Sequence, residues 1–257
     1  MARVIAVANQ KGGVGKTTTT INLAASLATA DERVLLIDLD PQANLTSGVG
    51  LRGSVPPERT VYAALTGSSV PLEALVLATK VANLAAIPAD RSLTGAEIEL
   101  VSMPDRESRL RSLLGPLRER FDHIFIDCPP SLGLLTLNAL VAADAVLIPL
   151  HCEYFALEGL ADLVATLKRV RAALNPALDI EGVLLTMHDE RTNLGQQVAR
   201  DVRSFFKEKV FQTAIPRNVR LAEAPSHGLP VLLYDVKSRG ASAYVTLAQE
   251  FLARRAS

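Results

Sequence analysis

The strongest constraint on the fold is the run Lys11–Thr18, Lys-Gly-Gly-Val-Gly-Lys-Thr-Thr, which directly follows the apolar stretch Val4–Ala8. The apolar stretch predicts a short buried strand over residues 4–9, and the apolar spacing after the run predicts a helix over residues 17–30. Glycines between a strand and a helix let backbone N–H groups turn inward around a phosphate, at the positive end of the helix dipole. The order of strand, loop and helix therefore predicts a phosphate-binding loop.

The second half of this loop contains the two side chains that such a loop requires. Lys16 would neutralise the outer phosphates, and the Thr17 hydroxyl would ligate Mg²⁺. The usual pattern starts with a glycine, but here Gln10 stands at that position and Lys11 follows it. The loop is therefore a deviant form that carries one lysine more than phosphate binding needs. A plain glycine-rich turn is the alternative, and it gives no reason for Lys-Thr at this spacing.

Three aspartates follow predicted buried strands. Asp38 and Asp40 end a strand that begins at Val34, and Asp127 ends another that begins at Phe121. Alternation along a strand places Asp38 and Asp40 on the same side, at the carboxyl edge where open α/β sheets bind ligands. Asp127 is then the natural acid to support Mg²⁺. Acids at strand ends are also common helix caps, and that alternative stays open.

The rest of the chain continues the alternation of strands and helices. We expect strands at residues 84–88, 145–150, 181–187 and 231–233, and helices at residues 156–174, 193–206 and 241–253, with several more helices between 60 and 120. This order predicts an α/β fold, a doubly wound and mainly parallel sheet with helices on both faces, as in P-loop nucleoside triphosphatases. No linker or repeat divides the sequence, so residues 1–257 are expected to form a single domain.

Composition narrows the class of protein further. Hydrophobic residues make up 49% of the chain, but no apolar run is long enough to cross a bilayer and no stretch resembles a signal peptide. Cys128 and Cys152 are expected to be small buried residues in a reducing cytosol. The net charge is −5 over residues 1–167 and +5 over residues 168–257. Such asymmetry is typical of a polyanion-binding face, although an excess this small is more often an ordinary solvated surface.

Five motifs in order carry a resemblance to a known family. They are Lys-Gly-Gly-Val-Gly-Lys-Thr-Thr, Asp-Leu-Asp-Pro-Gln, Ile-Asp-Cys-Pro-Pro, the segment Cys152–Gly159 and the segment Pro216–Gly228. With these motifs the sequence resembles the ParA/Soj chromosome-partitioning ATPases over nearly its whole length. The first three motifs also occur in a wider group that includes MinD and the nitrogenase iron protein, whereas the last two are more specific to the partitioning branch.

The resemblance implies an ATP- and Mg²⁺-dependent ATPase that works as a homodimer. In that family the extra lysine, here Lys11, crosses into the partner subunit and touches its ATP, and Gly12 is small because the partner approaches closely. Asp40 would position or activate the attacking water and, with Thr17 and Asp127, form the metal site, while Asp38 would be metal-linked or at the subunit interface. The implied phosphate and metal ligands are Gly13, Val14, Gly15, Lys16, Thr17, Thr18 and Asp127. The base is expected near Met187, Pro216, Arg217 and Asn218, although loop packing could explain these residues equally well.

The resemblance also implies partners and a location. Arg191 and Arg220 match the basic positions through which family dimers bind double-stranded DNA without sequence preference, and a ParB/Spo0J-like centromere-binding protein would stimulate hydrolysis. The expected location is the cytoplasm, in association with the nucleoid, without a membrane. The main alternative is a MinD-like membrane-associated positioning ATPase. A metabolic enzyme on the same loop and a nucleotide-binding module without hydrolysis are further alternatives.

Overall fold

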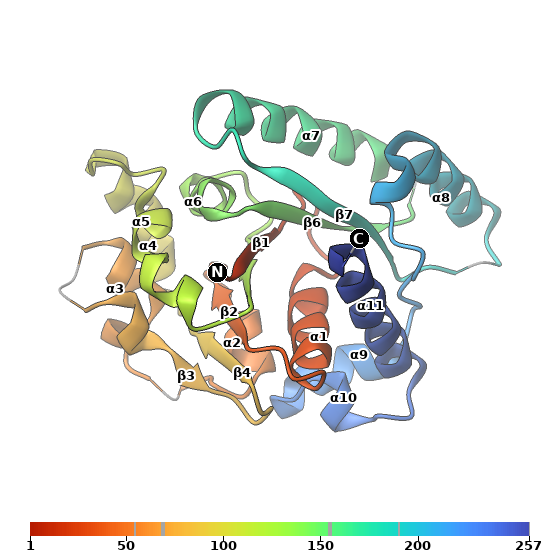
Figure 1. The fold of residues 1–257 in the computed structure, drawn as a ribbon, viewed down its shortest axis with the longest axis horizontal. Coiled ribbons are helices and arrows are strands. Elements are labelled where there is room, and N and C mark those ends of the chain that lie inside the picture. The colour runs from red at the N-terminus through yellow and green to blue at the C-terminus, as the bar shows by residue number, and fades with distance from the viewer. Residues whose placement is uncertain (54, 68–69, 154–155, 190, 257) are drawn as a thin grey trace.

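The protein is described here from a computed structural model, which covers residues 1–53, 55–67, 70–153, 156–189 and 191–256. One sheet of seven strands, in the order β3-β4-β2-β5-β1-β6-β7, runs through the middle of the molecule (Figure 1). The strands are β1 (Arg3–Val7), β2 (Val34–Asp38), β3 (Leu77–Ala78), β4 (Leu84–Ile87), β5 (His123–Asp127), β6 (Ala145–His151) and β7 (Asp179–Thr186). The expected mainly parallel sheet is confirmed, because among the described strands only the two-residue β3 pairs antiparallel.

The register of the central strands brings three strand ends together. Val7 of β1 is the partner of Asp127 of β5, and Asp127 is also the partner of Asp38 of β2. The loop that leaves β1 therefore begins beside two aspartates. This common carboxyl edge is where open α/β sheets bind their ligands.

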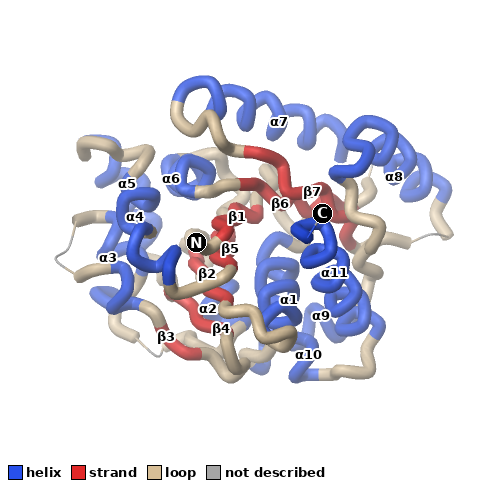
Figure 2. The backbone as a smooth tube through the Cα atoms, in the orientation of Figure 1, coloured by secondary structure: helices blue, strands red, loops and turns tan. Residues whose placement is uncertain are grey.

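Helices cover both faces of the sheet, as the alternation of elements predicts (Figure 2). On one face α1, α9, α10 and α11 lie together, and on the other face lie α3 to α8 (Figure 1). The helices are α1 (Lys16–Ala28), α2 (Asn44–Gly48), α3 (Val61–Leu65), α4 (Leu93–Glu99), α5 (Arg109–Leu113), α6 (Leu134–Ala142), α7 (Ala156–Ala173), α8 (Asn193–Phe206), α9 (Val219–Glu223), α10 (Val231–Tyr234) and α11 (Arg239–Ala256).

Side-chain alternation along β1 divides the core between these two faces. Val4 and Ala6 pack in the cluster that contains α6, whereas Ile5 and Val7 pack in the cluster that contains α1 and α11. This is the period of two that a strand imposes on its side chains. Because both faces are covered, every residue of β2 and β5 and all of β1 except Arg3 are buried.

One expected strand is wrong. Residues 231–233 form the one-turn helix α10 and not a strand. Proline at position 230 suits a helix entry because its φ angle is fixed, and the Val231 N–H donates to Asn22 Oδ1 of α1 at 2.7 Å. A three-residue apolar run has too little periodicity to distinguish a strand from a turn of helix. The segment Cys152–Gly159 is only partly placed, because residues 154 and 155 lie outside the described part of the chain.

Candidate nucleotide site

The loop between β1 and α1 has the backbone that its glycines predict. Gly13 and Gly15 have φ angles of 70° and 85°, in the left-handed region that disfavours any side chain. Gly15 is the residue that caps the N-terminus of α1. Gly12 has no such angle, and a Cβ atom added there would meet nothing within 4 Å. The glycines at 13 and 15 are therefore needed by the loop itself, whereas Gly12 is not.

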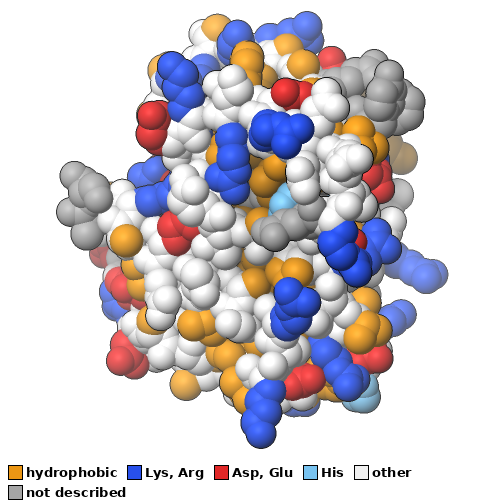
Figure 3. Space-filling model, turned by 90° about the vertical axis from the view of Figure 1, so that its right-hand side faces the viewer, with side chains coloured by type: hydrophobic (Ala, Val, Ile, Leu, Met, Phe, Trp, Pro, Cys, Tyr) orange, Lys and Arg blue, Asp and Glu red, His pale blue; other side chains and the backbone are white. Residues whose placement is uncertain are grey.

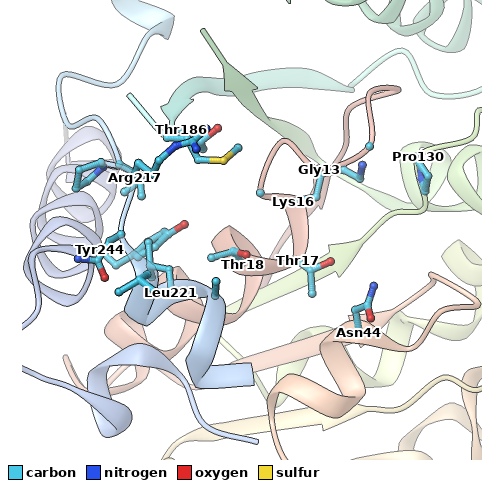
Figure 4. A pocket seen from close by; sticks show the side chains of 18 of the residues that line it. Gly13, Lys16, Thr17, Thr18, Asn44, Pro130, Thr186, Arg217, Leu221 and Tyr244 are labelled. Carbon is cyan, nitrogen blue, oxygen red and sulfur yellow. The ribbon is translucent and has the colours of Figure 1, made fainter. Parts of the chain in front are cut away.

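A cavity of about 650 Å³ lies over this loop at the carboxyl edge of the sheet (Figure 4). Its wall combines the loop with residues from the far end of the chain. Of the residues expected from the sequence, Gly12, Gly13, Gly15, Lys16, Thr17, Thr18, Asp40, Met187, Pro216, Arg217 and Asn218 line it. Val14 lies behind the wall, where it is buried and its carbonyl accepts a hydrogen bond from Thr186 Oγ1 at 2.8 Å.

Lys16 is the buried cation of the cavity. Its ammonium donates to the main-chain carbonyl of Lys11 at 3.1 Å, so the loop folds over on itself. Burial lowers the pKa of Lys16, and the carboxyl groups of Asp127 and Asp40 oppose this change. A phosphate at this point would replace a neutral carbonyl with a charged acceptor, which is the stronger partner for an ammonium.

Asp127 is completely buried behind Thr17 of the cavity wall and holds the start of α1. It accepts hydrogen bonds from Thr17 Oγ1 at 2.7 Å and from Thr20 Oγ1 at 3.1 Å. Burial raises the pKa of Asp127, and the neighbouring charge of Asp38 raises it further. Two buried carboxyl groups side by side favour the arrival of a cation, because a cation offsets their mutual repulsion.

Alternation along a strand predicts similar surroundings for Asp38 and Asp40. Their surroundings differ, because β2 ends at Asp38 and Asp40 lies beyond it. Asp38 is completely buried and accepts from the Thr46 backbone N–H at 2.9 Å and the Thr46 hydroxyl at 2.7 Å. Its other oxygen accepts from the Asp40 N–H at 3.1 Å. Asp40 instead lines the cavity, and its Oδ1 accepts from the Gln42 N–H at 2.9 Å. Asp38 therefore supports the loop that presents Asp40.

The residues at this edge fit a magnesium ion that arrives with phosphates. Within the described residues no group of three or more His, Cys, Asp or Glu side chains could hold a metal alone. Mg²⁺ needs no such cage, because it keeps several waters and binds through one or two protein ligands plus substrate phosphates. The Thr17 hydroxyl, held by Asp127 and exposed to the cavity, provides a ligand of this kind.

Lys11 does not line the cavity. Its ammonium instead forms an ion pair with Glu153, just beyond β6, at 2.5 Å. Glu153 also lies 3.0 Å from His151 Nδ1. The surplus lysine of the loop therefore points away from the site that Lys16 serves.

Several residues of the cavity were not foreseen from the sequence. Tyr244 of α11 and Leu221 of α9 lie on the side opposite the loop (Figure 4). Thr186 of β7 also lines the cavity, and its Oγ1 contacts the loop through the Val14 carbonyl. The Tyr244 hydroxyl is 3.1 Å from Thr19 Oγ1, a hydrogen bond that ties α11 to α1. Asn44, Gln42 and Pro130 complete the rim near the aspartates. Gln42 and Pro130 end the Asp-Leu-Asp-Pro-Gln and Ile-Asp-Cys-Pro-Pro motifs, whereas no local pattern marks Thr186, Leu221 or Tyr244, because each comes from a different element.

The two arginines expected to bind DNA lie outside this cavity. Arg191, whose side chain is 89% exposed, pairs with Asp189, and Arg220 pairs with Glu223 and Asp235. A second hollow of about 690 Å³ lies beside Arg191 and shares Pro216 and Arg217 with the first cavity. Arg239 and His188 also line it, and His188 Nδ1 has no hydrogen-bond partner within the described residues. Lys and Arg side chains are spread over the face seen in Figure 3, around a hollow at its centre.

The sheet, the loop and the cavity together define a P-loop nucleotide-binding protein. A family model described as an AAA domain matches residues 2–180. The chain is 54% identical to the chromosome partitioning protein ParA of Myxococcus xanthus (strain DK1622), over 99% of this chain and 89% of that protein. It is 55% identical to the sporulation initiation inhibitor protein Soj of Bacillus subtilis (strain 168), over 98% of this chain and 99% of that protein. The chain belongs to the ParA/Soj family of chromosome-partitioning ATPases.

Solved structures agree with the fold. Cobyrinic acid a,c-diamide synthase of Mycobacterium smegmatis with a bound ATP analogue and magnesium is 38% identical, with a TM-score of 0.85 over 100% of this chain and 97% of that one. The cell division ATPase MinD of Pyrococcus furiosus is 28% identical, with a TM-score of 0.80 over 98% of this chain and 99% of that one. The MinD-like alternative is a membrane-associated ATPase. Among the described residues, no helix has the length and apolarity to span a bilayer.

Proposed function

We propose that this protein is an ATP-dependent switch for chromosome or plasmid partitioning, built as one domain over residues 1–257. ATP binding drives two chains into a sandwich dimer, and the dimer binds double-stranded DNA without sequence preference. Hydrolysis, stimulated by a ParB/Spo0J-like centromere-binding protein, returns the chain to the monomer. The ATP-bound protein would therefore be cytoplasmic and associated with the nucleoid. The observation that carries this proposal is the position of Lys11, whose ammonium pairs with Glu153 and does not line the cavity that most of its loop lines.

ATP with Mg²⁺ is the ligand that the cavity suits. The loop Gly13–Thr18 would wrap the phosphates, with Val14 contributing through its backbone. Met187, Pro216, Arg217 and Asn218 line the cavity, and the base would fit beside them. Arg217 lies across the cavity from Lys16 (Figure 4). Support comes from the M. smegmatis neighbour, whose structure holds an ATP analogue and magnesium.

Hydrolysis requires a positioned water and cations for the charge that builds on the γ-phosphate. Asp40 lines the cavity and would position or activate this water. Lys16 would stabilise the charge from within the chain, and Lys11 of the partner subunit would add a second cation. Thr17, supported by Asp127 and with Asp40 nearby, would hold Mg²⁺, which neutralises phosphate charge when it is bound.

DNA binding is supported by the basic surface around Arg191. Arg217 and Arg239 line the same hollow, and the second half of the chain carries the positive net charge. Arg220 lies on α9 and would extend this surface. Phosphate contacts release counterions, so a dimer that doubles the number of cations would bind DNA more tightly and with a steeper salt dependence.

The test is DNA binding with ATP, ADP and no nucleotide across a salt series, with oligomeric state measured in parallel. We expect DNA binding and a dimer with ATP only. Arg191→Ala and Arg220→Ala should each weaken DNA binding and flatten its salt dependence while the dimer persists, and Lys80→Ala on the surface between β3 and β4 is the matched control. Equal affinity of the arginine variants at matched salt would contradict the assignment. Binding to anionic vesicles without DNA binding would favour the MinD-like alternative.

A further inference from the structure

Both the backbone and the side chain of Lys11 form contacts within their own subunit. Its N–H donates to Asn9 Oδ1 at 3.0 Å, and Asn9 Nδ2 in turn donates to the Pro149 carbonyl of β6 at 2.7 Å. Its carbonyl accepts from Lys16 Nζ at 3.1 Å. Its ammonium reaches Glu153 Oε2 at 2.5 Å. These contacts therefore hold Lys11 near β6, and its side chain does not line the cavity.

Glu153 is suited to hold this lysine because both of its carboxyl oxygens are engaged. Oε2 meets the Lys11 ammonium, and Oε1 lies 3.0 Å from His151 Nδ1. The Lys11 ammonium lowers the pKa of the Glu153 carboxyl below its ordinary value, so the pair is charged at neutral pH. The side chains of Lys11 and Glu153 are 38% and 48% exposed, so a competing anion in solution could reach the ammonium.

The same contacts connect Lys11 to the nucleotide cavity. The Lys16 ammonium that donates to the Lys11 carbonyl is also the cation on which a phosphate would sit. A phosphate would draw Lys16 away from this carbonyl, because a charged acceptor makes a stronger hydrogen bond than a neutral one. After that step the carbonyl of Lys11 is released, its N–H still donates to Asn9 Oδ1, and Glu153 is the group that retains its side chain.

We infer that Glu153 is a positioning residue, which retains Lys11 within its own subunit and competes with the phosphates of a second subunit for the same ammonium. This inference rests on the proposed ATP-dependent dimer. Each subunit must break its Lys11–Glu153 ion pair before its lysine can cross the interface. Glu153 therefore sets the ATP concentration at which the chain dimerises, and it keeps the lysine from engaging a partner at low ATP.

The size of the effect follows from the exposure of the pair. An exposed ion pair changes an equilibrium by a factor of about 1.5 to 5. Two such pairs break for each dimer formed, so their removal should strengthen dimerisation by about 2- to 30-fold. The affinity of the monomer for ADP should not change, because Lys11 does not line its own cavity.

The test compares Glu153→Gln with Lys11→Ala, with the double variant and with Glu107→Gln. The last is the control, because Glu107 forms an ion pair with Arg106 away from the site, with side chains that are 29% and 43% exposed. Dimerisation is followed by sedimentation during a titration with ATPγS, which is hydrolysed slowly, and ADP binding is followed by calorimetry. We expect Glu153→Gln to dimerise at lower nucleotide concentration with unchanged ADP affinity, and Glu107→Gln to match the parent chain. The double variant should stay monomeric like Lys11→Ala, because the effect of Glu153 is exerted through Lys11.

The possible failures are distinguishable. If the parent chain stays monomeric at saturating ATPγS, the proposed function fails and the inference fails with it. If the parent chain dimerises but Glu153→Gln needs the same or more nucleotide, Glu153 does not compete for Lys11 and the inference alone is overturned. Dimerisation of the double variant at the same low nucleotide concentration as Glu153→Gln would also overturn it. A loss of ADP affinity in Glu153→Gln would indicate a general structural role instead.

Discussion

The two ends of the nucleotide cavity are built in different ways. The phosphate end consists of one continuous loop, Gly13–Thr18, supported by Asp127 at the end of the neighbouring strand. The opposite end is assembled from the chain after β7, the chain before α9, α9 and α11, which contribute Met187, Leu221 and Tyr244 among others. A charged phosphate needs a fixed arrangement of N–H groups and cations, whereas a flat base needs mainly a surface to lie against. Substitutions should therefore cost much more at the phosphate end.

Replacement of Lys16 is expected to have the largest effect. Lys16→Ala removes the buried cation of the phosphate end and leaves the phosphates without their charged donor. Loss of one member of a buried charge pair costs about 2–5 kcal/mol, so ATP affinity should fall at least about 30-fold. Calorimetry with ATP measures this directly, and Arg217→Ala at the other end is the comparison, with a loss of less than about tenfold. Tight ATP binding by Lys16→Ala would remove the assignment of the loop.

Replacement of Asp40 should separate binding from turnover. Asp40 lines the cavity, and Asp38 supports it through a hydrogen bond to its backbone N–H. Asp40→Ala should keep ATP affinity within a few-fold and lower the hydrolysis rate about 10²-fold or more, because a positioned acid-base group contributes that much. Single-turnover hydrolysis is the measurement, and the ATP-bound dimer should accumulate. Unchanged hydrolysis would show that another residue positions the water.

The sequence predicted the phosphate end because its determinants are local. Glycines, Lys16 and Thr17 lie within one short run, and Asp127 ends the strand that pairs with β1. Met187 and residues 216–218 came only from a family resemblance, while Thr186 and Tyr244 were not foreseen. The hydrogen bond between Tyr244 and Thr19 joins residues 225 positions apart, and no local period records such a contact. The wrong strand at 231–233 has the same origin, because the bond from Val231 to Asn22 that favours a helix spans 209 positions.

Alanine substitutions should distinguish the glycines of the phosphate loop from one another. Gly15→Ala forces a side chain into a backbone with φ of 85°, which costs about 1–2 kcal/mol of stability or distorts the start of α1. Gly12→Ala has open space around it and should leave the monomer as stable as the parent chain. Chemical denaturation measures both. If the partner subunit approaches Gly12 closely, Gly12→Ala should also fail to dimerise with ATP while it still binds ATP as a monomer.

The smallest effect is expected from Tyr244→Phe, at the end of the cavity opposite the loop. The substitution keeps the aromatic ring that lines the cavity and removes only the hydroxyl that is 3.1 Å from Thr19 Oγ1. Thr19 is completely buried, so its hydroxyl loses a partner, and stability should fall by about 0.5–1.5 kcal/mol. ATP affinity should change less than about threefold, because the lost bond joins α11 to α1 and does not reach the cavity. Denaturation and ATP calorimetry on the same variant separate these two quantities. An affinity loss as large as that of Lys16→Ala would mean that substitutions at the two ends of the cavity weaken ATP binding equally. It would also mean that the contact between α11 and α1 controls the conformation of the phosphate loop.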